Sequence, residues 1–501
     1  MAMKHSTGQD RPDRKTKRNL IMFPLGTVGR DMMYSLVTSY LLTFVLYAHT
    51  LTSAQLTAII IIMIAARVFD ALNDPLMGCV IERTRSRFGK FKPWLCIGIL
   101  STSLVIYLIF NVKLQGWAFV IFFGIMYFLY SITYTMHDIA YWSMIPALSS
   151  EADLRNQYTS RAALFAGIGA VLASSLIPVL TAGNMALGGN TLTAYGRVAL
   201  IIAVLGPLFI AFTVFGVQEG PKAQHEPAAA FSVRDIFSTI IRNRQLLWIA
   251  LVFLLQQISN GLVSSGFGQT YIYLRYGYDG MYYSVCQTLG VSVTAFLMLF
   301  YPALSRRMTR KTMMRLLMVL TGSGYGIMLV SGFLPPFASF MTLTAGYMLV
   351  NFGQYGFYLI MMISIMNTIE YNEYQFGERD ESIIASLRPF LTKLSSAINI
   401  GIVNITYIAA GIIRYTNGIA DLEQASSINS LSPTEKAEQI TALLSHVQHT
   451  QTIGLLAAMT ALPCLLIFVA YRLYQKNFKL DEREYERICH EIALRRQAEE
   501  T

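Results

Sequence analysis

The chain has 501 residues, of which 54% are apolar and only 14% are charged, and its mean hydropathy is +0.46. A soluble protein carries about 25% charged residues, whereas here apolar stretches of the roughly 20 residues that cross a bilayer recur along nearly the whole chain. These values exclude an ordinary soluble protein and predict an all-α polytopic protein in a lipid bilayer. The net charge of +10 does not indicate a nucleic-acid partner, because the basic residues cluster in alternate loops.

Residues 1–19 are polar and basic and contain no short apolar region that ends in a cleavage site. They are therefore predicted to form a tail, and the first span is expected to stay in the mature protein. Twelve spans are predicted after this tail, over residues 20–48, 54–81, 93–112, 117–147, 159–182, 196–217, 246–272, 282–304, 313–333, 338–367, 383–413 and 450–474.

A polar, Pro- and Ala-rich linker at 218–245 divides the spans into two sets of six. The predicted domains are thus a tail at 1–19, a six-helix bundle at 20–217, the linker, a second six-helix bundle at 246–474 and a tail at 475–501. Each bundle has a basic loop after its second span. Two repeated bundles are the plan of secondary transporters, which bind their substrate near the bilayer midplane.

Basic residues gather before the first span, between spans two and three, between spans eight and nine, and in the C-terminal tail. The opposite loops are nearly free of strong bases. The positive-inside rule therefore predicts that both termini are cytoplasmic, in the inner (cell) membrane. An even number of spans agrees with this orientation.

The polar segment 414–450 lies outside the cell on this topology. A short surface helix is expected from PTEKAEQITALLSHV, residues 433–447. No function is assigned to this segment from the sequence.

Ionisable residues at bilayer depth are costly and are functional candidates for that reason. From the helix rise, five of them lie roughly 12 to 18 Å inside the membrane. These five are Asp31, Asp70, Asp74, Asp138 and Lys393. They come from four spans and are predicted to converge on one layer.

Asp70 and Asp74 are four residues apart, so both carboxylates project from one helical face. Their repulsion is relieved by a hard cation such as Na⁺ or Li⁺, which prefers oxygen ligands, or by a shared proton. Asn73 and Thr135 can add neutral oxygens. The alternative is an internal ion pair between Arg67 and Asp70; cation coupling is preferred because Arg67 cannot satisfy every acid in the layer.

Asp31 and Asp138 are predicted to accept hydrogen bonds from the hydroxyls of a sugar, with Trp142 as a flat apolar face and Arg161 as a guanidinium. The alternative is that Trp142 packs in the core or against lipid and that Arg161 snorkels to the membrane surface. Tyr134 and Tyr358 are weaker candidates, because most of the 28 tyrosines must be packing residues.

The stretch RVFDALNDPLMGCVIERTRSRFGKFKPW, residues 67–94, resembles the signature of the glycoside–pentoside–hexuronide:cation symporters, which include the melibiose carrier. The resemblance continues at VGRDMMY, YTMHDIAYWSMIP and IEYNEYQFGERDESIIASLRPFLTK, so that it covers both halves. It implies a major-facilitator fold of twelve helices in two bundles. It places the cation site at Asp70, Asn73, Asp74 and Thr135, and the sugar site at Arg30, Asp31, Tyr134, Asp138, Trp142 and Arg161, with Tyr358 and Lys393 opposite.

Three positions depart from the melibiose carrier. Arg30 replaces a lysine, Tyr358 replaces a tryptophan, and Asn367 replaces an acid. The cation site is unaffected by these changes, while the identity of the sugar stays open.

The sequence thus predicts a monomeric symporter that moves a sugar or glycoside together with Na⁺, or alternatively Li⁺ or H⁺, by alternating access and without a further cofactor. The cation is expected to bind before the sugar, because Thr135 and Asp138 share one helical face. A lipid or lysolipid carrier and a transport-inactive sugar sensor are the alternatives. An enzyme is not expected, because the chain has no large catalytic domain outside the membrane.

Overall fold

The computed structural model describes residues 14–149, 151–218, 241–264, 267–334, 338–377, 381–428 and 430–499. Most of the predicted linker and of the N-terminal tail lies outside these ranges. The described residues are almost entirely helical. The first helix already begins at Arg14, six residues before the predicted start of the first span.

The N-terminal bundle contains six predicted spans. The first consists of α1, a π-helical turn η1 and α2, which join end to end. The bounds are α1 Arg14–Ser35, η1 Leu36–Tyr40, α2 Leu41–Ala48, α3 Ser53–Arg83, α4 Lys92–Asn111, α5 Gly116–Leu148, α6 Ala152–Thr181 and α7 Thr191–Gly216, with a 3₁₀ turn η2 at Gly183–Met185. Thr52 begins α3 with a reciprocal capping box to Gln55, which fixes the sharp turn after α2.

The C-terminal bundle contains the other six predicted spans and three additional helices. The spans are formed by α9 Arg244–Ser264 with α10 Phe267–Tyr276, α11 Gly280–Arg307, α12 Arg310–Phe333, α13 Phe340–Phe376, α14 Glu381–Ala409 and α17 His449–Asn477. The additional helices are α15 Ile413–Ser427, α16 Pro433–Ser445 and the C-terminal α18 Glu482–Glu499. Ser432 and Glu435 form a capping box at the start of α16, so the short helix expected there is confirmed.

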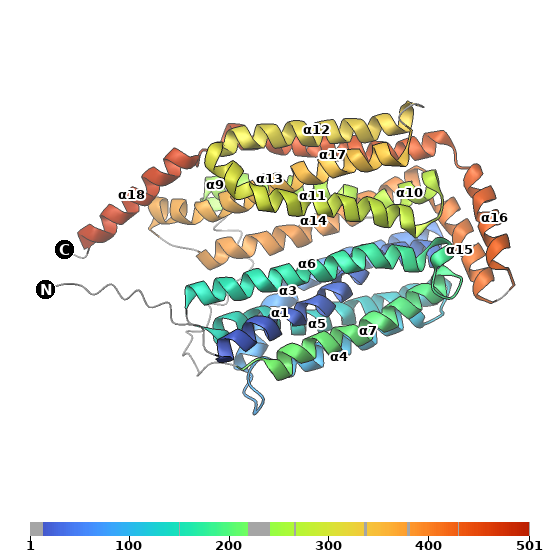
Figure 1. Ribbon diagram of the computed structural model, residues 1–501, viewed down its shortest axis with the longest axis horizontal. Helices are drawn as coiled ribbons and strands as arrows, with labels where there is room; N and C mark the ends of the chain where they lie inside the picture. Colours follow the sequence, from blue (N-terminus) through green and yellow to red (C-terminus); the bar gives the residue numbers. More distant parts are fainter. Residues whose placement is uncertain are drawn as a thin grey trace.

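By length and apolar character, ten helices within the described ranges can cross a membrane, or eleven if one bent pair counts as a span. The bent pair is α14 with α15, which meet at an angle of 91°. The helix α11 is not among the ten, although it covers the predicted span 282–304 and runs beside the others (Figure 1). The structure thus supports ten to eleven of the twelve predicted spans by length and apolar character, and the helix α11 covers the remaining one.

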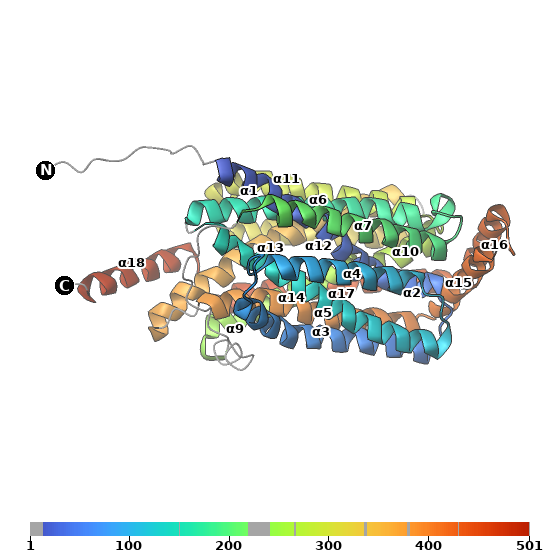
Figure 2. The same ribbon diagram turned by 90° about the horizontal axis from the view of Figure 1, so that it is seen from below.

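The two bundles lie side by side, with the N-terminal bundle in the lower half of Figure 1 and the C-terminal bundle in the upper half. They meet where α3 packs on α14, α6 packs on α11 and α2 packs on α15. We call the end where α1 begins and α18 lies the terminal end, and the opposite end, with α15 and α16, the cap end (Figures 1 and 2). The start of α1 and the helix α18 thus lie at the same end of the molecule.

Candidate functional site

A buried arginine on α1 lies between two carboxylates. Its Nη2 atom is 2.8 Å from Oδ2 of Asp31, and its Nη1 atom is 3.0 Å from Oδ1 of Asp138 on α5. The Arg30 side chain is only 3% exposed, whereas Asp138 is 33% exposed. The guanidinium also lies 4.9 Å from the ring centre of Tyr141 and 5.0 Å from that of Trp142. The structure thus brings four predicted sugar-site residues together: Arg30, Asp31, Asp138 and Trp142.

This arrangement suits a polar ligand. A planar guanidinium can hold two carboxylates at once, which a lysine ammonium does less rigidly. Each carboxylate has further lone pairs to offer, and the partial exposure of Asp31 and Asp138 leaves those oxygens accessible. The indole of Trp142 provides an apolar face beside them. The cluster can accept hydrogen bonds from several hydroxyl groups on one side of a ring.

Asp70 has two partners within the N-terminal bundle. The hydroxyl of Ser131 on α5 donates a short hydrogen bond to its Oδ1 atom. Nη1 of Arg67, one turn earlier on α3, lies 3.6 Å from its Oδ2 atom. The ion pair weighed as the alternative to cation binding is therefore present, although at a distance longer than a hydrogen bond.

Asp74 is held from two sides. Thr135 on α5 donates a hydrogen bond of 3.2 Å to Oδ1 of Asp74. Nζ of Lys393, on α14 of the other bundle, forms an ion pair with Oδ2. The sequence groups Lys393 with the sugar site, but its contact is with the predicted cation ligands.

Asn73 completes the predicted cation set. Its side chain is half-buried, and its Nδ2 atom is buried without a hydrogen-bond partner among the described residues. All four predicted cation ligands thus lie along the facing sides of α3 and α5. Thr135, which donates to Asp74, lies one turn before Asp138 on α5, so the two clusters adjoin in one charged layer. Oxygen donors on two helices are the kind of ligand that a small hard cation prefers.

Two predicted sugar-site residues, Arg161 and Tyr358, make their contacts outside the Arg30 cluster. Arg161 is exposed and donates a hydrogen bond of 3.2 Å to the main-chain oxygen of Leu20, as the snorkelling alternative expects. The ring of Tyr358 lies 6.0 Å from that of Phe253 and beneath the guanidinium of Arg388, within the C-terminal bundle.

Tyr134 belongs to a row of aromatic rings on α5. Its ring centre is 5.5 Å from that of Tyr130, 5.4 Å from that of Tyr34 and 4.7 Å from that of His137. It lies one turn before Asp138 on the same helix, so it borders the charged layer. Its contacts are those of a packing residue.

The sequence reasoning missed Ser131. A signal for it was available, because Ser131, Thr135, Asp138 and Trp142 are spaced by three or four residues and therefore share one face of α5. Serine is frequent in membrane helices, where its hydroxyl can also bond to the main chain of its own helix. Spacing relative to a known ligand is thus more informative than residue type.

A family model described as "MFS/sugar transport protein" matches residues 22–482. Curated relatives include the lactose permease of Leuconostoc lactis, 28% identical over 80% of this chain and 65% of the relative. The raffinose carrier protein of Pediococcus pentosaceus is 24% identical over 94% of this chain and 71% of the relative. The isoprimeverose transporter of Lactiplantibacillus pentosus is 23% identical over 78% of this chain and 80% of the relative. The chain thus spans about two thirds of the length of the first of these relatives.

Solved structures support the architecture. A bacterial homologue of the human lysosomal transporter Spinster, in an inward-facing conformation, has a TM-score of 0.65 at 11% identity and covers 93% of this chain and 99% of its own. A D-xylose–proton symporter has a TM-score of 0.57 at 10% identity and covers 93% of this chain and 98% of its own. At such identities they show the fold alone. The chain therefore has the major-facilitator fold and belongs to the MFS/sugar transport protein family, a family of membrane transporters and not of enzymes, as its resemblance to the glycoside–pentoside–hexuronide:cation symporters implies.

Proposed function

We propose that this protein is a symporter that moves a sugar or glycoside together with a cation by alternating access. The observation that carries the proposal is the single charged layer, in which hydroxyl-binding carboxylates on α1 and α5 adjoin a carboxylate pair on α3. The printed names of the relatives, which concern lactose, raffinose and isoprimeverose, support a glycoside as the substrate class. We take Na⁺ as the coupling cation, with Li⁺ or H⁺ as alternatives.

The ion pair between Asp74 and Lys393 suggests how coupling works. Lys393 neutralises Asp74 and links the two bundles at the level of the site. A cation that binds between Asp70 and Asp74 competes with the ammonium for the same oxygens, so it releases Lys393 and loosens the link. The freed lysine can then face the sugar site or leave with α14. Cation binding in this way alters both the sugar site and the contact between the bundles.

The sugar site is proposed at Arg30, Asp31, Asp138 and Trp142. Arg30 holds both carboxylates in position, so hydroxyls of the ligand meet preoriented acceptors. One guanidinium against two carboxylates leaves a net negative site, which favours a neutral glycoside over a uronide. Both termini are proposed to be cytoplasmic in the cell membrane, with the protein acting as a monomer.

Counterflow in proteoliposomes tests the function. Vesicles preloaded with lactose, raffinose, isoprimeverose or a uronide are mixed with the labelled sugar while Na⁺, Li⁺ and pH are varied in turn. We expect counterflow of at least one neutral glycoside and its stimulation by one cation. Asp138→Asn should abolish counterflow, Asp74→Asn should abolish its cation dependence, and Asp153→Asn, an exposed carboxylate of α6, should change neither. Counterflow that no cation stimulates would contradict symport.

A further inference from the structure

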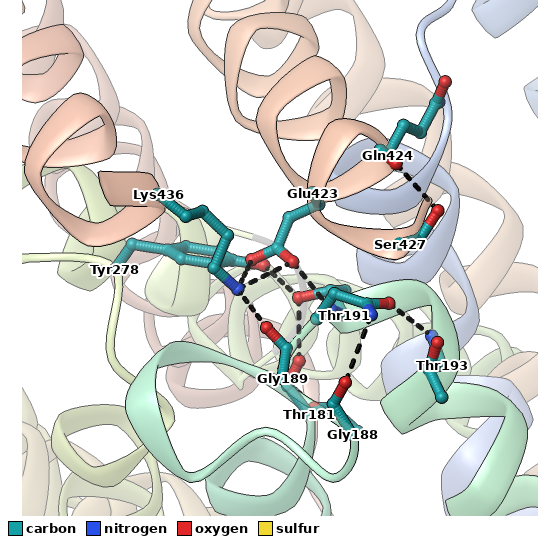
Figure 3. A network of polar contacts seen from close by, with 11 residues as sticks. Thr181, Gly188, Gly189, Thr191, Thr193, Tyr278, Glu423, Gln424, Ser427 and Lys436 are labelled. Atoms are coloured by element: carbon teal, nitrogen blue, oxygen red, sulfur yellow. Dashed lines mark hydrogen bonds and ion pairs between the residues drawn. The ribbon is translucent and has the colours of Figure 1, made fainter. Parts of the chain in front are cut away.

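The segment between α14 and α17 contains the most deeply buried ion pair among the described residues. Nζ of Lys436 on α16 lies 3.1 Å from Oε2 of Glu423 on α15 (Figure 3). The Glu423 side chain is 0% exposed and that of Lys436 is 6% exposed. Burying two charges is costly unless they are paired and their remaining hydrogen bonds are satisfied. The segment is therefore structured far more tightly than a surface loop.

Those remaining hydrogen bonds go to the other bundle. The main-chain N–H of Thr191 donates to Oε2 of Glu423 over 2.7 Å, and Nζ of Lys436 donates to the oxygen of Gly189 over 2.6 Å. Thr191 is the first residue of α7, where main-chain N–H groups have no partner within the helix and a negative charge is favoured. The hydroxyls of Thr191 and Tyr278 are 2.7 Å apart, which adds a third link from the C-terminal bundle.

The loop before α7 is shaped for this contact. Gly188 and Gly189 have φ angles of +93° and +81°, which residues with a side chain rarely adopt. Asn190 then caps α7 by accepting a hydrogen bond of 2.8 Å from the N–H of Thr193. Figure 3 shows Gly189 and Thr191 presented side by side to the Glu423–Lys436 pair. A substitution at Gly189 would disturb this geometry through the backbone alone.

One face of α15 binds a second part of the N-terminal bundle. Asn417 donates to the oxygen of Leu51 over 2.8 Å and accepts from its N–H over 3.0 Å. Gln424 donates to the oxygen of Ala48 over 3.1 Å, and Asp421 accepts from the hydroxyl of Thr50. The three α15 residues are spaced by four and three positions, so they lie on one helical face. They grip the non-helical turn between α2 and α3.

We propose that α15 and α16 form a clamp that holds the two bundles together at the cap end, and that the Glu423–Lys436 pair binds this clamp to Gly189 and Thr191 of the N-terminal bundle. The proposal rests on alternating access, in which the bundles must separate at this end. Both charges belong to the C-terminal bundle, so opening breaks their bonds to Gly189 and Thr191 but not the pair itself. The pair then becomes hydrated while still neutralised, and the clamp can release without leaving an isolated buried charge.

A cysteine pair reports on the closed cap end. The hydroxyl oxygens of Ser175 on α6 and Thr288 on α11 are 2.8 Å apart across the bundles. Both positions are replaced by cysteine in a chain from which the five native cysteines have been removed. The rate of disulfide formation is measured in membranes with neither sugar nor added cation. The reporter therefore reads closure at the cap end independently of transport.

Two clamp variants are compared with matched controls. Asn417→Ala removes two hydrogen bonds to the other bundle, and the double variant Glu423→Gln with Lys436→Met removes the charged pair without stranding either charge. The controls are Thr441→Ala and Glu438→Gln, exposed residues of α16. We expect Asn417→Ala to slow cross-linking by up to roughly thirtyfold, because two lost hydrogen bonds at about 1 kcal/mol each disfavour the closed state, and the double variant to slow it at least as much.

Unchanged rates in both clamp variants would overturn the proposal, and so would equal slowing in the controls. If the double variant does not fold, Asn417→Ala decides alone. Failure of counterflow with normal cross-linking of the parent would count against symport and leave the clamp standing.

Discussion

Two ion pairs lie where the bundles meet. They differ in how exposed their side chains are and in whether the two residues belong to different bundles or to the same one. The Asp74–Lys393 pair lies in the middle of the molecule, joins one bundle to the other, and has side chains that are 34% and 27% exposed. The Glu423–Lys436 pair lies at the cap end, belongs to one bundle, and is almost fully buried. A partly hydrated pair can exchange one partner for a cation at low cost. A dry pair resists separation of its own charges.

The difference teaches how one chain can combine a labile contact with a durable one. Lys393 is an exchangeable counter-ion, whose replacement is part of the proposed transport cycle. Lys436 is a fixed counter-ion, which lets a carboxylate reach the start of α7 without being stranded. A pair with one residue in each bundle must break when the bundles separate, whereas a pair within one bundle can stay intact.

The largest expected effect comes from splitting the buried pair. Lys436→Met leaves the Glu423 carboxylate buried without its counter-ion, so the free energy of unfolding should fall by about 3–5 kcal/mol. Thermal unfolding in detergent measures the loss. Adding Glu423→Gln to the same chain should recover most of it. Equal losses in the single and double variants would show that the two charges are not coupled.

A smaller effect is expected at the middle of the molecule. Lys393→Gln should lower the free energy of unfolding by about 1 kcal/mol or less, because Asp74 remains partly hydrated. The rise in melting temperature on adding the coupling cation should begin at lower cation concentration, since Nζ no longer competes for Asp74. A stability loss as large as that of Lys436→Met would contradict the distinction between the two pairs.

The smallest effect is expected at the surface. Lys311 and Asp481 are 3.2 Å apart with side chains 45% and 38% exposed. Lys311→Gln should change the free energy of unfolding by no more than about 0.5 kcal/mol, because such a pair gains little in water. The same melting experiment serves as the reference for the two internal pairs. A loss above that of Lys393→Gln would mean that exposure does not rank these contacts.

The fold and most of the charged layer could be predicted from the sequence. Apolar length predicted the spans, ten or eleven of which have helices long and apolar enough to cross a membrane, and spacing placed Asp70 with Asp74 and Thr135 with Asp138 on shared faces. The family match over residues 22–482 confirms the resemblance carried by the span-two motif. Local periodicity was sufficient here because each of these relations lies within one helix.

Relations between distant helices could not be predicted in this way. Lys393 and Asp74 are 319 positions apart, and only the packing of α14 on α3 brings them together. In the sequence, Arg161 cannot be distinguished from a ligand-binding arginine. In the structure it lies near the start of α6 and donates a hydrogen bond to the main-chain oxygen of Leu20. The helix α15 was missed because its polar residues, such as Asn417 and Gln424, bind the neighbouring bundle and not water. Hydropathy cannot distinguish a polar side chain that binds a neighbouring helix from one that binds water.

Sugar binding to the purified protein, measured at equilibrium with and without the coupling cation, tests the shared charged layer most directly. If the cation releases Lys393 from Asp74 and thereby completes the sugar site, saturating cation should tighten binding roughly tenfold, within the usual range of coupling between two sites. Asp74→Asn should abolish that gain. Equal sugar affinity with and without Na⁺, with and without Li⁺, and at low and high pH would contradict the account.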